Sequence, residues 1–513
     1  MSGLTRGVLM STSFASLGAM MFGVDNGWWG TVIGLPTFND RFGTNAVVGA
    51  DGTITHALSA SQQSAGTALG YAGIMIGCAL ATPVGRIGGR RFGVKLMAVV
   101  SIVGVLIEIM ASVKGHRYWQ LVAGKIIASI AMGLAANVIP TYQSELAPAK
   151  WRGAVINIYQ TVQIIGVIIA TAVVYGLNTR TTDIAWQTPI GIQFGPPVLL
   201  LAGVFFMPES PRWLVFQNRP EEARRVLHGL HGSTPGYSAE EEVAQLQAAF
   251  EHEMSIEKPS IFAVFKGSDR RRALISMGVM CLQQAQGSSY MTNYIVLFLM
   301  ALGMTDVFKL VMIIYMLYFV AILGSFYLPD RFGRRPLLMG GAAICAATLF
   351  ITCGINVGYG DAITPSAQKA ALAMIFIWYF FFGLVWSPLV WITCTEVCSA
   401  RAREPTLSAA TFGAFATALI ITLVSPYIQD AGYGNAGAAI GFIWAGMTAI
   451  SIPFVYFFVP EMRGLTLEQI DDLFDRGISA RKFRSVPLSD AEVGVIVGTP
   501  ASESVKEEAE MSK

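Results

Sequence analysis

Long apolar stretches, each bounded by polar residues, recur along almost the whole chain. A helix needs about 20 apolar residues to cross roughly 30 Å of hydrocarbon, and twelve stretches meet that requirement. They lie near residues 7–29, 62–84, 93–113, 119–141, 154–177, 189–207, 273–300, 309–328, 337–357, 370–393, 407–428 and 438–459. The pattern predicts an all-α membrane protein with twelve transmembrane helices.

A polar interruption divides the spans into six and six. Residues 209–272 are rich in Glu, Arg and His at helical spacing, as in PEEARRVLHGLH, which predicts short amphipathic helices outside the bilayer. We therefore expect an N-terminal six-helix bundle over 1–208, a cytosolic linker over 209–272 and a C-terminal bundle over 273–460. The polar tail, 461–513, is predicted to be cytosolic and largely disordered.

Composition supports this class and argues against others. The 513 residues are 53% hydrophobic and 13% charged, whereas a soluble domain has about 25% charged residues. The net charge is +2 with no arm dense in Lys and Arg, which argues against a nucleic-acid partner. The six cysteines lack zinc or disulfide spacing, and no phosphate-binding loop occurs, so we predict no enzyme, cofactor or metal site.

Lys and Arg residues in the short loops predict the orientation. One side of the membrane collects eleven: Arg86, Arg90, Arg91, Lys95, Lys150, Arg152, Arg331, Arg334, Arg335, Arg401 and Arg403. The other side collects six: Arg41, Lys114, Arg117, Arg180, Lys309 and Lys369. Because cytosolic loops carry the excess of positive charge, we expect both termini in the cytosol, and we expect the plasma membrane as the location.

The two halves resemble each other in sequence. Three pairs of motifs recur at nearly one offset: Arg90-Arg91 and Arg334-Arg335 are 244 residues apart, Glu145 and Glu396 are 251 apart, and Pro208-Glu209 and Pro460-Glu461 are 252 apart. Six spans per half bring both halves in from the same side, which predicts two pseudo-symmetric bundles related by an axis along the membrane normal. A substrate site is then expected near the midplane between them.

Several motifs resemble those of a known family. DRFGRR (330–335), PESPRWL (208–214), PEMRGLTLEQI (460–470), QQAQGSSYMTNY (283–294) and ELAPAKWRG (145–153) resemble the sugar-porter branch of the major facilitator superfamily, over roughly residues 8–475. FGVDN, the GSS after the paired Gln, and WQTPIGIQF (186–194) are most similar to fungal disaccharide and alpha-glucoside permeases. The resemblance implies a membrane carrier whose solute is a carbohydrate.

Charged residues at the predicted inner helix ends form the first candidate site. Carboxylate–guanidinium pairs between neighbouring helix ends can hold the inner face shut in one state and release it in the other. The candidate cytosolic gate comprises Glu145, Arg152, Glu209, Asp330, Arg334, Arg335, Glu396, Arg403 and Glu461. The first half carries Arg86 where the second has Asp330, so we expect its pairing to be altered.

Asp25 stands inside an apolar run, and Lys125 is the cation deep within another. A charge at a bilayer centre costs roughly 2.5 to 3.5 kcal/mol on insertion scales, and pairing offsets that cost. The resemblance implies that the helices of both residues line one half-cavity, with Lys125 at a position where the family has Arg. If protonation of Asp25 breaks the pair, the protein is a proton symporter. Glu108 is expected to reach the interface or face packed protein, without a coupling role.

Uncharged polar side chains on two spans predict a solute site. Gln160 and Gln163 share one helical face, and Gln283, Gln286, Ser289 or Tyr290, and Asn293 follow helical spacing. Such stripes normally face a water-filled cavity, and amides suit a neutral polyhydroxylated ligand. Trp391 offers a flat face for a sugar ring. The resemblance places Gln160, Gln283, Gln284 and Trp391 on sugar-binding positions.

Departures from the family pattern leave the solute and the mode of action open. Ser289 replaces an Asn, Ala414-Phe415 replaces an Asn-Trp pair, and Tyr318 replaces a further Asn, which favours a ligand larger or less polar than glucose. The first hypothesis is proton-coupled uptake of a disaccharide, glycoside, hexose or related polyol. The alternatives are an exporter of a specialised metabolite on the same scaffold, and a sugar sensor that transports nothing.

Overall fold

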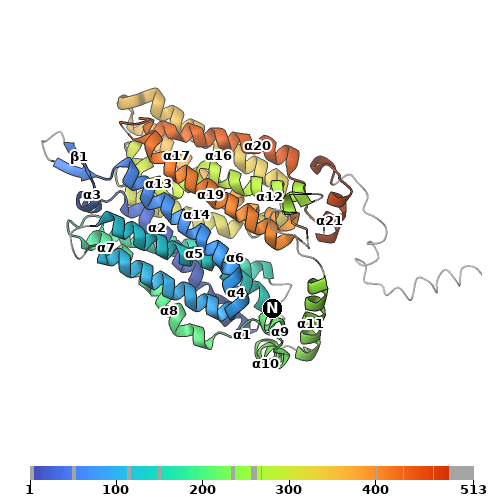
Figure 1. Ribbon diagram of the computed structural model, residues 1–513. Helices are drawn as coiled ribbons and strands as arrows, with labels where there is room; N and C mark the ends of the chain where they lie inside the picture. Colours follow the sequence, from blue (N-terminus) through green and yellow to red (C-terminus); the bar gives the residue numbers. More distant parts are fainter. Residues whose placement is uncertain are drawn as a thin grey trace, which may run out of the picture.

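The structure of this chain is a computed structural model, which describes residues 5–48, 54–112, 117–147, 152–232, 237–255, 263–266, 269–399, 402–430, 432–465 and 467–483. Within these ranges the chain is helical almost throughout, and its sheet has two strands. The helices lie roughly parallel in two groups, one from each half of the chain (Figure 1). The predicted all-α membrane fold is confirmed.

The first half supplies six spans. They are α1 (Arg6–Ala15) continued by α2 (Leu17–Val32), the long α4 (Ala60–Met110) that holds spans 2 and 3, α5 (Tyr118–Leu146), α6 (Arg152–Leu177), and a sixth built from α7 (Ile184–Gly191), η2 (Ile192–Phe194), α8 (Gly195–Gly203) and η3 (Val204–Phe206).

The second half repeats the count. Span 7 is α12 (Asp269–Gln283), the π-helical turn η5 (Gln284–Ser288) and α13 (Ser289–Ala301), and span 8 is α14 (Val307–Gly324), followed by the short α15 (Leu328–Phe332). Spans 9 to 12 are α16 (Arg334–Tyr359); α17 (Pro365–Phe381) with η7 (Phe382–Trp386) and α18 (Ser387–Val397); α19 (Arg403–Gln429); and η8 (Gly437–Ile440) with α20 (Gly441–Phe458). The remaining short turn, η6 (Gly360–Ala362), precedes α17.

Length and apolar composition qualify ten helical segments of the described chain as membrane spans. One of these segments, α4, contains two predicted spans, which raises the number of spans to eleven. Span 7 is the twelfth, and it does not qualify as one long helix because η5 interrupts it. The twelve predicted spans are thus all present as helices. Large apolar side chains along them are exposed on the protein surface, among them Ile76, Val103, Val320, Ile420 and Ile450, as expected of helices that face lipid.

Spans 2 and 3 join without a loop at Gly89. Its φ of 84° and ψ of 179° break the helix inside α4, and a Cβ at this position would lie 2.5 Å from Glu209 Oε2. Gly333, between α15 and α16, has a matching φ of 89°. Both positions need glycine because other residues rarely adopt positive φ, so the two halves turn at the same place in the repeat.

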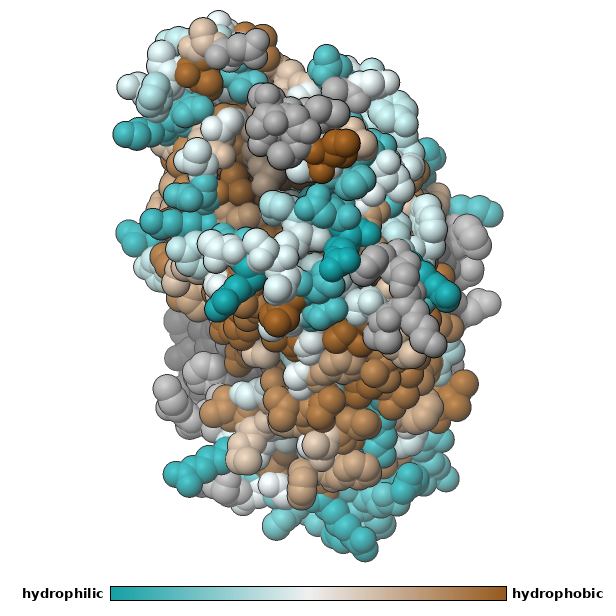
Figure 2. Space-filling model, turned by 90° about the vertical axis from the view of Figure 1, so that its left-hand side faces the viewer, coloured by the Kyte–Doolittle hydropathy of each residue, from teal (hydrophilic) through white to brown (hydrophobic). Residues whose placement is uncertain are grey.

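The two ends of the bundle differ in structure. At one end α3 (Pro36–Phe42) precedes an antiparallel hairpin of β1 (Asn45–Val48) and β2 (Ile54–Ala57), with Asn45 opposite Ala57. We call this the hairpin end. Figure 2 views it directly and shows a hydrophilic band across the middle, with hydrophobic residues gathered below the band.

The opposite end, which we call the linker end, carries α9 (Pro211–Phe216), α10 (Pro220–His231) and α11 (Ala239–Ser255), with η4 (Ala263–Phe265) further along the linker. The start of α1 and the helix α21 (Leu467–Asp475) lie at this same end (Figure 1). Both ends of the described chain therefore emerge on one side of the bundle. The bounds of the two bundles and the linker stay a prediction.

The expected disorder of the tail is wrong for its first part. Ile470, Leu473 and Phe474 of α21 are buried in the main hydrophobic core. The buried Arg272 at the start of α12 pairs with Asp471, and its Nη2 lies 3.0 Å from Asp475 Oδ1. An amphipathic helix that finds an apolar surface and a buried cation is stabilised by packing, which composition alone does not reveal. The turn η9 (Ala480–Lys482) follows, and residues 484–513 lie outside the described ranges.

The linker packs on the N-terminal bundle through α10. Thr5, the N-cap of α1, donates its hydroxyl to the Leu230 carbonyl. His231 is 7% exposed, and its ring lies 5.3 Å from the Tyr237 ring. Burial lowers the pKa of His231, against smaller opposing effects of the Glu242 carboxylate and the Leu146 backbone.

His231 is predicted to make this packing sensitive to pH. Because its folded pKa is lowered, the stability it contributes is present above the ordinary value of about 6.5 and is lost as the pH falls from there through the lowered folded pKa. The melting temperature of the purified protein should therefore fall more between pH 7.5 and 5.5 than that of His231→Gln. The exposed neighbour His228 is the control, and His228→Gln should keep the wild-type response. An unchanged response in His231→Gln would contradict the prediction.

Candidate functional site

A buried ion pair joins span 1 to span 4. Lys125 Nζ on α5 lies 3.5 Å from Asp25 Oδ2 on α2, and the residues are 5% and 3% exposed. Trp28 Nε1 donates to the other carboxylate oxygen of Asp25 at 3.2 Å. The two ionisable residues singled out in the sequence are thus in contact and are both enclosed by protein.

Aromatic rings complete the surroundings of the ammonium group. Lys125 Nζ lies 5.1 Å from the centre of the Trp28 ring and 5.0 Å from that of Trp29. Trp29 is fixed by its own hydrogen bond to Thr67 Oγ1, at 2.8 Å. Ring faces attract a desolvated cation, so Lys125 is held without the two-pronged contact that an Arg would make. Sequence reasoning missed this role of the tryptophans, although they follow Asp25 within one helical turn.

The ion pair lies on the side of α2 that faces away from α6. Gly23 and Gly27 pack against α6, where a Cβ at Gly23 would overlap the Gln163 carbonyl and one at Gly27 would lie 2.9 Å from Val167 Cα. Asp25 lies two residues from each glycine, hence near the opposite helical face. In this state the pair is therefore enclosed between α2 and α5 instead of lining an open cavity.

The same helix touches the other half of the molecule. A Cβ at Gly30 would lie 2.5 Å from the Thr292 carbonyl oxygen on α13, and one at Gly34, just beyond α2, would overlap Val296. The spacing of glycines 23, 27, 30 and 34 resembles the small-residue stripes of closely packed membrane helices. This signal was present in the sequence and was missed. As a result, α2 connects the ion pair to both α6 and span 7.

Hydrogen bonds between the halves gather at the hairpin end. Within the described ranges, Gln63 Nε2 donates to Asp430 Oδ2 at 3.3 Å, and Ser64 Oγ donates to the Leu423 carbonyl at 2.6 Å. Nearer the middle, Asn293 Nδ2 donates to the Tyr71 hydroxyl at 3.0 Å. These contacts close the hairpin end, and they place the predicted residue Asn293 at the interface of the bundles.

Three polar residues of span 7 form one connected network. Ser289 Oγ donates to Gln284 Oε1 at 2.6 Å, and Gln284 Nε2 donates to Gln283 Oε1 at 3.3 Å. Gln283 Nε2 in turn donates to the carbonyls of Trp386 and Ser387, at 3.0 and 3.2 Å. Three predicted solute residues thus lie together beside span 10, with uncharged donors and acceptors only.

Gln286 does not belong to this network, contrary to the predicted helical stripe. It is fully buried and donates to Ser451 Oγ on α20 at 3.0 Å. The reason is the π-helical turn η5, where Gly287 has a φ of 97°. An extra residue in the turn rotates the following side chains, so the regular spacing assumed from the sequence fails there.

The remaining predicted solute residues stand apart. Gln160 and Gln163 are half-buried on α6, and within the described residues no hydrogen bond joins them to the amides of span 7. Trp391, on α18, is 37% exposed. The α6 helix packs against α14, where the Tyr318 hydroxyl donates to Ser387 Oγ at 2.8 Å. Tyr318 therefore adds an aromatic group to the network through Ser387.

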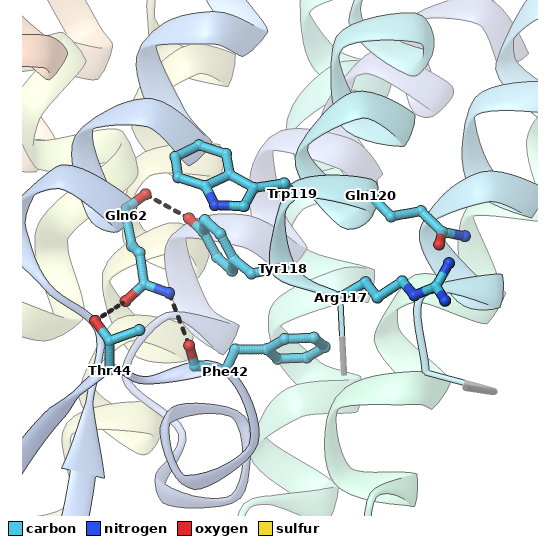
Figure 3. Close-up of a pocket in the computed structure, with 7 residues that line it drawn as sticks. All are labelled: Phe42, Thr44, Gln62, Arg117, Tyr118, Trp119 and Gln120. Atoms are coloured by element: carbon cyan, nitrogen blue, oxygen red, sulfur yellow. Dashed lines mark hydrogen bonds between the residues drawn. The ribbon is translucent and has the colours of Figure 1, made fainter. Parts of the chain in front are cut away.

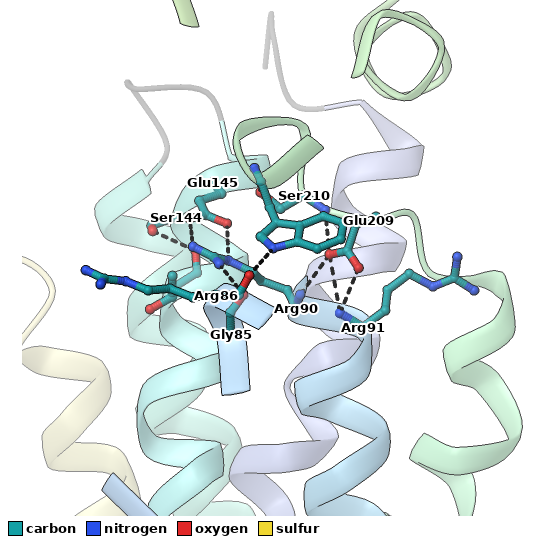
Figure 4. A network of polar contacts seen from close by, with 10 residues as sticks. Gly85, Arg86, Arg90, Arg91, Ser144, Glu145, Glu209 and Ser210 are labelled. Atoms are coloured by element: carbon teal, nitrogen blue, oxygen red, sulfur yellow. Dashed lines mark hydrogen bonds and ion pairs between the residues drawn. The ribbon is translucent and has the colours of Figure 1, made fainter. Parts of the chain in front are cut away.

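At the linker end of the first half, an Arg side chain binds both oxygens of a Glu carboxylate, an arrangement that we call an Arg fork (Figure 4). Arg90 donates to both oxygens of Glu145, at 2.9 Å from Nε and 2.6 Å from Nη2. Glu209 accepts from the backbone N–H groups of Arg90 and Arg91, at 2.9 and 3.3 Å. A carboxylate at the first N–H groups of a helical segment is favoured by hydrogen bonding and by the helix dipole. Among the side chains that the structure describes, Glu145 thus pairs with Arg90, which lies outside the predicted gate.

The second half repeats this arrangement. Arg334 donates to both oxygens of Glu396, at 3.1 and 2.8 Å. Glu461 accepts from the backbone N–H groups of Arg334 and Arg335, at 3.1 and 3.0 Å. The equal geometry shows that the Arg86 departure leaves the first-half fork intact, because the backbone of Arg90 and the charge of Glu145 carry it. Any other difference between the halves that follows from Arg86 and Asp330 stays a prediction, because the side chain of Asp330 lies outside the described residues.

Three predicted gate residues play other parts or cannot be placed. Arg403 donates to the Thr395 carbonyl at 3.1 Å. The side chains of Arg152 and Asp330 lie outside the described part of the structure.

A further acid is buried near the ion pair. Glu108 on α4 has no exposed surface, and its Oε2 accepts a hydrogen bond from Gln193 Nε2 at 2.9 Å. Glu108 therefore faces packed protein and does not reach the interface, which decides between the two expected positions.

Comparison with known proteins gives the family. The family described as "Sugar (and other) transporter" matches residues 11–474. The chain belongs to the sugar porter family. The major facilitator-type transporter ecdD of Aspergillus rugulosus is 30% identical to this sugar porter, covering 92% of this chain and 88% of that protein. The low-affinity glucose transporter HXT3 of Saccharomyces cerevisiae is 27% identical, covering 92% and 83%. The high glucose sensor RGT2 of the same yeast is 28% identical, covering 90% and 60%.

Solved structures share the fold of this sugar porter. The inward open conformation of the xylose transporter XylE from E. coli has a TM-score of 0.74 at 22% identity, covering 91% of this chain and 99% of that one. XylE bound to 6-bromo-6-deoxy-D-glucose has a TM-score of 0.71 at 21% identity, covering 92% and 100%. The chain is therefore a multi-pass membrane protein with the major facilitator fold.

A surface pocket of about 550 Å³ lies at the hairpin end of this sugar porter (Figure 3). Gln62 organises it by donating to the Phe42 carbonyl at 2.7 Å and accepting from the Thr44 hydroxyl at 3.0 Å. Its lining is Phe42, Thr44, Gln62, Arg117, Tyr118, Trp119 and Gln120. It contains none of the predicted solute or coupling residues, so it is separate from the candidate site.

The Arg334 fork is predicted to stabilise the sugar porter. Arg334→Lys keeps the charge but loses the two-pronged contact with Glu396. A hydrogen bond between charged groups contributes roughly 1.5 to 3 kcal/mol, so the melting temperature in detergent should fall clearly. Arg331→Lys is the matched control, since Arg331 is exposed and contacts Tyr327, and it should melt as the wild type does. Equal melting of both variants would contradict the prediction.

The interruption of span 7 is predicted to require glycine. Gly287→Ala places a Cβ 2.9 Å from the Trp444 Cβ at a φ of 97°, and a left-handed conformation alone costs roughly 1 to 2 kcal/mol. The variant should melt at a lower temperature. Gly354→Ala, in helix α16 with no atom within 4 Å of the added Cβ, should melt at or above the wild-type temperature. A Gly287→Ala protein as stable as Gly354→Ala would count against a strained turn.

Proposed function

We propose that this protein is a proton-coupled sugar importer that works by alternating access. The observation that carries the proposal is the enclosed pair of Asp25 and Lys125, with a nitrogen–oxygen distance of 3.5 Å. A protein that needs only a stable scaffold gains little from such a pair, since apolar residues often serve as well. A carboxylate that can take up a proton lets the pair respond to the proton gradient, which explains why a transporter would keep it.

The coupling runs through α2. While Asp25 is ionised, it binds Lys125 and holds α2 against α5. Protonation removes the negative charge, so the attraction is lost and α2 can shift relative to its neighbours. Since Gly30 packs on the Thr292 backbone of span 7, a shift of α2 alters the contact between the two halves. The charge of one residue thereby biases which side of the membrane the site faces.

The available energy is sufficient for uphill transport. A proton that moves down one pH unit yields about 1.4 kcal/mol, and 100 mV adds about 2.3 kcal/mol. The sum supports accumulation of a neutral solute on the order of several hundred-fold, because about 1.4 kcal/mol corresponds to one factor of ten.

The solute class is a neutral carbohydrate or polyol. Gln283, Gln284 and Ser289 provide uncharged donors and acceptors beside span 10, and they would exchange their mutual hydrogen bonds for hydroxyl groups of the solute. Gln160 and Gln163 would contact it from the first half, and the partly exposed Trp391 offers a ring face. Relatives named as glucose transporters support this class. The proposed solutes are therefore a disaccharide, glycoside, hexose or related polyol.

Closure at the hairpin end and the forks at the linker end define the two sides of the cycle. With the linker end and both termini in the cytosol of a plasma-membrane protein, as the Lys and Arg distribution favours, the state described here is closed to the outside. The forks of Arg90 with Glu145 and of Arg334 with Glu396 join helix ends within each half. They would keep each bundle rigid while the inner face opens and closes.

One observation favours export of a specialised metabolite as the second candidate. Phe415 belongs to the Ala414-Phe415 pair that replaces the family's Asn-Trp pair. The centre of its ring is 6.4 Å from the centre of the Tyr71 ring in the other half. This aromatic contact suits a less polar solute. Proteoliposomes discriminate the two candidates: an acidic exterior should drive sugar inward under the first and should have no effect on sugar under the second.

Asp25→Asn is predicted to abolish uphill accumulation while leaving exchange of solute across the membrane. The neutral amide cannot release a proton, so the solute is no longer tied to the proton gradient. The measurement is uptake of hexoses, disaccharides and polyols by transporter-null cells at two external pH values. Asp306→Asn is the matched control, because Asp306 is exposed with a φ of 53° that Asn tolerates. Undiminished accumulation in Asp25→Asn would remove that residue from the mechanism.

A further inference from the structure

Glu108 is a buried acid that the coupling scheme above does not use. It is fully buried on α4, where Gln193 Nε2 donates to its Oε2 at 2.9 Å. Its other oxygen, Oε1, has no hydrogen-bond partner among the described residues. A buried carboxylate normally collects several donors because desolvation of the charge is costly. Glu108 has one hydrogen-bond donor within the described ranges, which suits a neutral acid better than an ion.

Glu108 also lies beside the ion pair. Gly124 precedes Lys125 in the chain, and a Cβ on Gly124 would lie 2.6 Å from the Glu108 backbone nitrogen and 2.8 Å from Glu108 Cγ. The absence of that Cβ lets α4 approach α5 at the depth of the pair. Lys125 is the next residue of α5 after Gly124, and its partner Asp25 lies on α2, while η2 contributes the neutral Gln193.

The charges of this cluster balance only if one carboxyl group is protonated. Two ionised carboxylates and one ammonium would leave a net charge of −1 in a region where all three side chains are almost inaccessible to water. One proton shared between the acids makes the cluster neutral. In the state described here Asp25 contacts Lys125 directly, so the proton belongs on Glu108.

We propose that Glu108 holds this proton and exchanges it with Asp25, an inference that rests on the proposed coupling role of the pair. In the transfer, the O–H bond of Glu108 breaks and an O–H bond forms on Asp25. Asp25 becomes neutral, Glu108 becomes the carboxylate, and Lys125 changes its counter-ion from one acid to the other. No net charge enters or leaves the cluster.

This exchange removes a difficulty of a two-residue scheme. Protonation of Asp25 by itself would leave the buried ammonium of Lys125 without a counter-charge, which is strongly unfavourable. With Glu108 alongside, Lys125 faces one carboxylate at every step. The contact between α2 and α5 can then be released without the full cost of an unpaired cation.

Infrared spectroscopy of the purified transporter, in a detergent without ester groups and with no solute added, tests the proposal. A protonated carboxyl group absorbs apart from ionised carboxylates, so the wild type should show a band that Glu108→Gln removes. Asp25→Asn should remove the same band, because the neutral Asn obliges Glu108 to ionise as partner of Lys125. The exposed Glu221 is the control, and Glu221→Gln should leave the band unchanged.

Gln193→Leu locates the proton. Loss of the hydrogen bond to Glu108 Oε2 should move the band to higher frequency without removing it. A band on Asp25 would not respond in this way. The double variant Asp25→Asn/Glu108→Gln leaves Lys125 without a carboxylate partner. Its melting temperature should therefore fall by more than the sum of the decreases in the two single variants.

Three results would overturn the proposal: a wild type without a band that Glu108→Gln removes, an Asp25→Asn protein that retains the band, or a band that Gln193→Leu leaves unshifted. A purely structural Glu108 would give the second result. These spectra need no transport, so they remain decisive if sugar uptake proves independent of protons. Failure of the proposed function would appear separately, as accumulation in Asp25→Asn equal to that of the wild type.

Discussion

The arrangement of the first bundle depends on one constraint, which is that a charge inside the membrane needs a partner. Asp25 and Lys125 satisfy it for each other at 3.5 Å, and the rings of Trp28 and Trp29 take up the remaining faces of the ammonium. Because each charge is costly alone and tolerable in the pair, α2 and α5 must stay in register while both are ionised. A change in protonation is then a change in the force between two helices.

The structure transmits that force through close backbone contact. The glycines of α2 let this helix contact the Gln163 carbonyl on α6 and the Thr292 carbonyl on span 7. A movement of the ion pair is therefore passed directly to the opposite half. The predicted solute residues of span 7 lie around the π-helical turn at Gly287. An interrupted helix has backbone groups and side chains that can change partners at low cost, which makes this span a suitable place for a solute to act on the same interface.

The two halves share a scaffold and differ in chemistry. At the linker end both use an Arg fork on a Glu and a second Glu that accepts from backbone N–H groups, with near-equal distances. In the middle, the first half holds the ion pair and Glu108, whereas the second holds an uncharged network around Gln283 and Gln284. Rigid, repeated ends and dissimilar centres suit the proposed carrier, in which two bundles rock about a site that binds a neutral solute and a proton through different side chains.

The sequence by itself determined the twelve spans, the repeat and the family, because hydrophobic length and matched motifs are local properties. It also singled out Asp25, since an acid in an apolar run is conspicuous on its own. Tertiary structure decided the rest: that Glu145 pairs with Arg90, that Gln286 turns toward α20, that α21 is ordered on the core, and that Glu108 lies beside Lys125. Each of these depends on which helices are in contact and on how each helix is rotated about its axis. The extra residue of a π-helical turn changes the rotation, and the missing Cβ of a glycine decides which helices can approach each other.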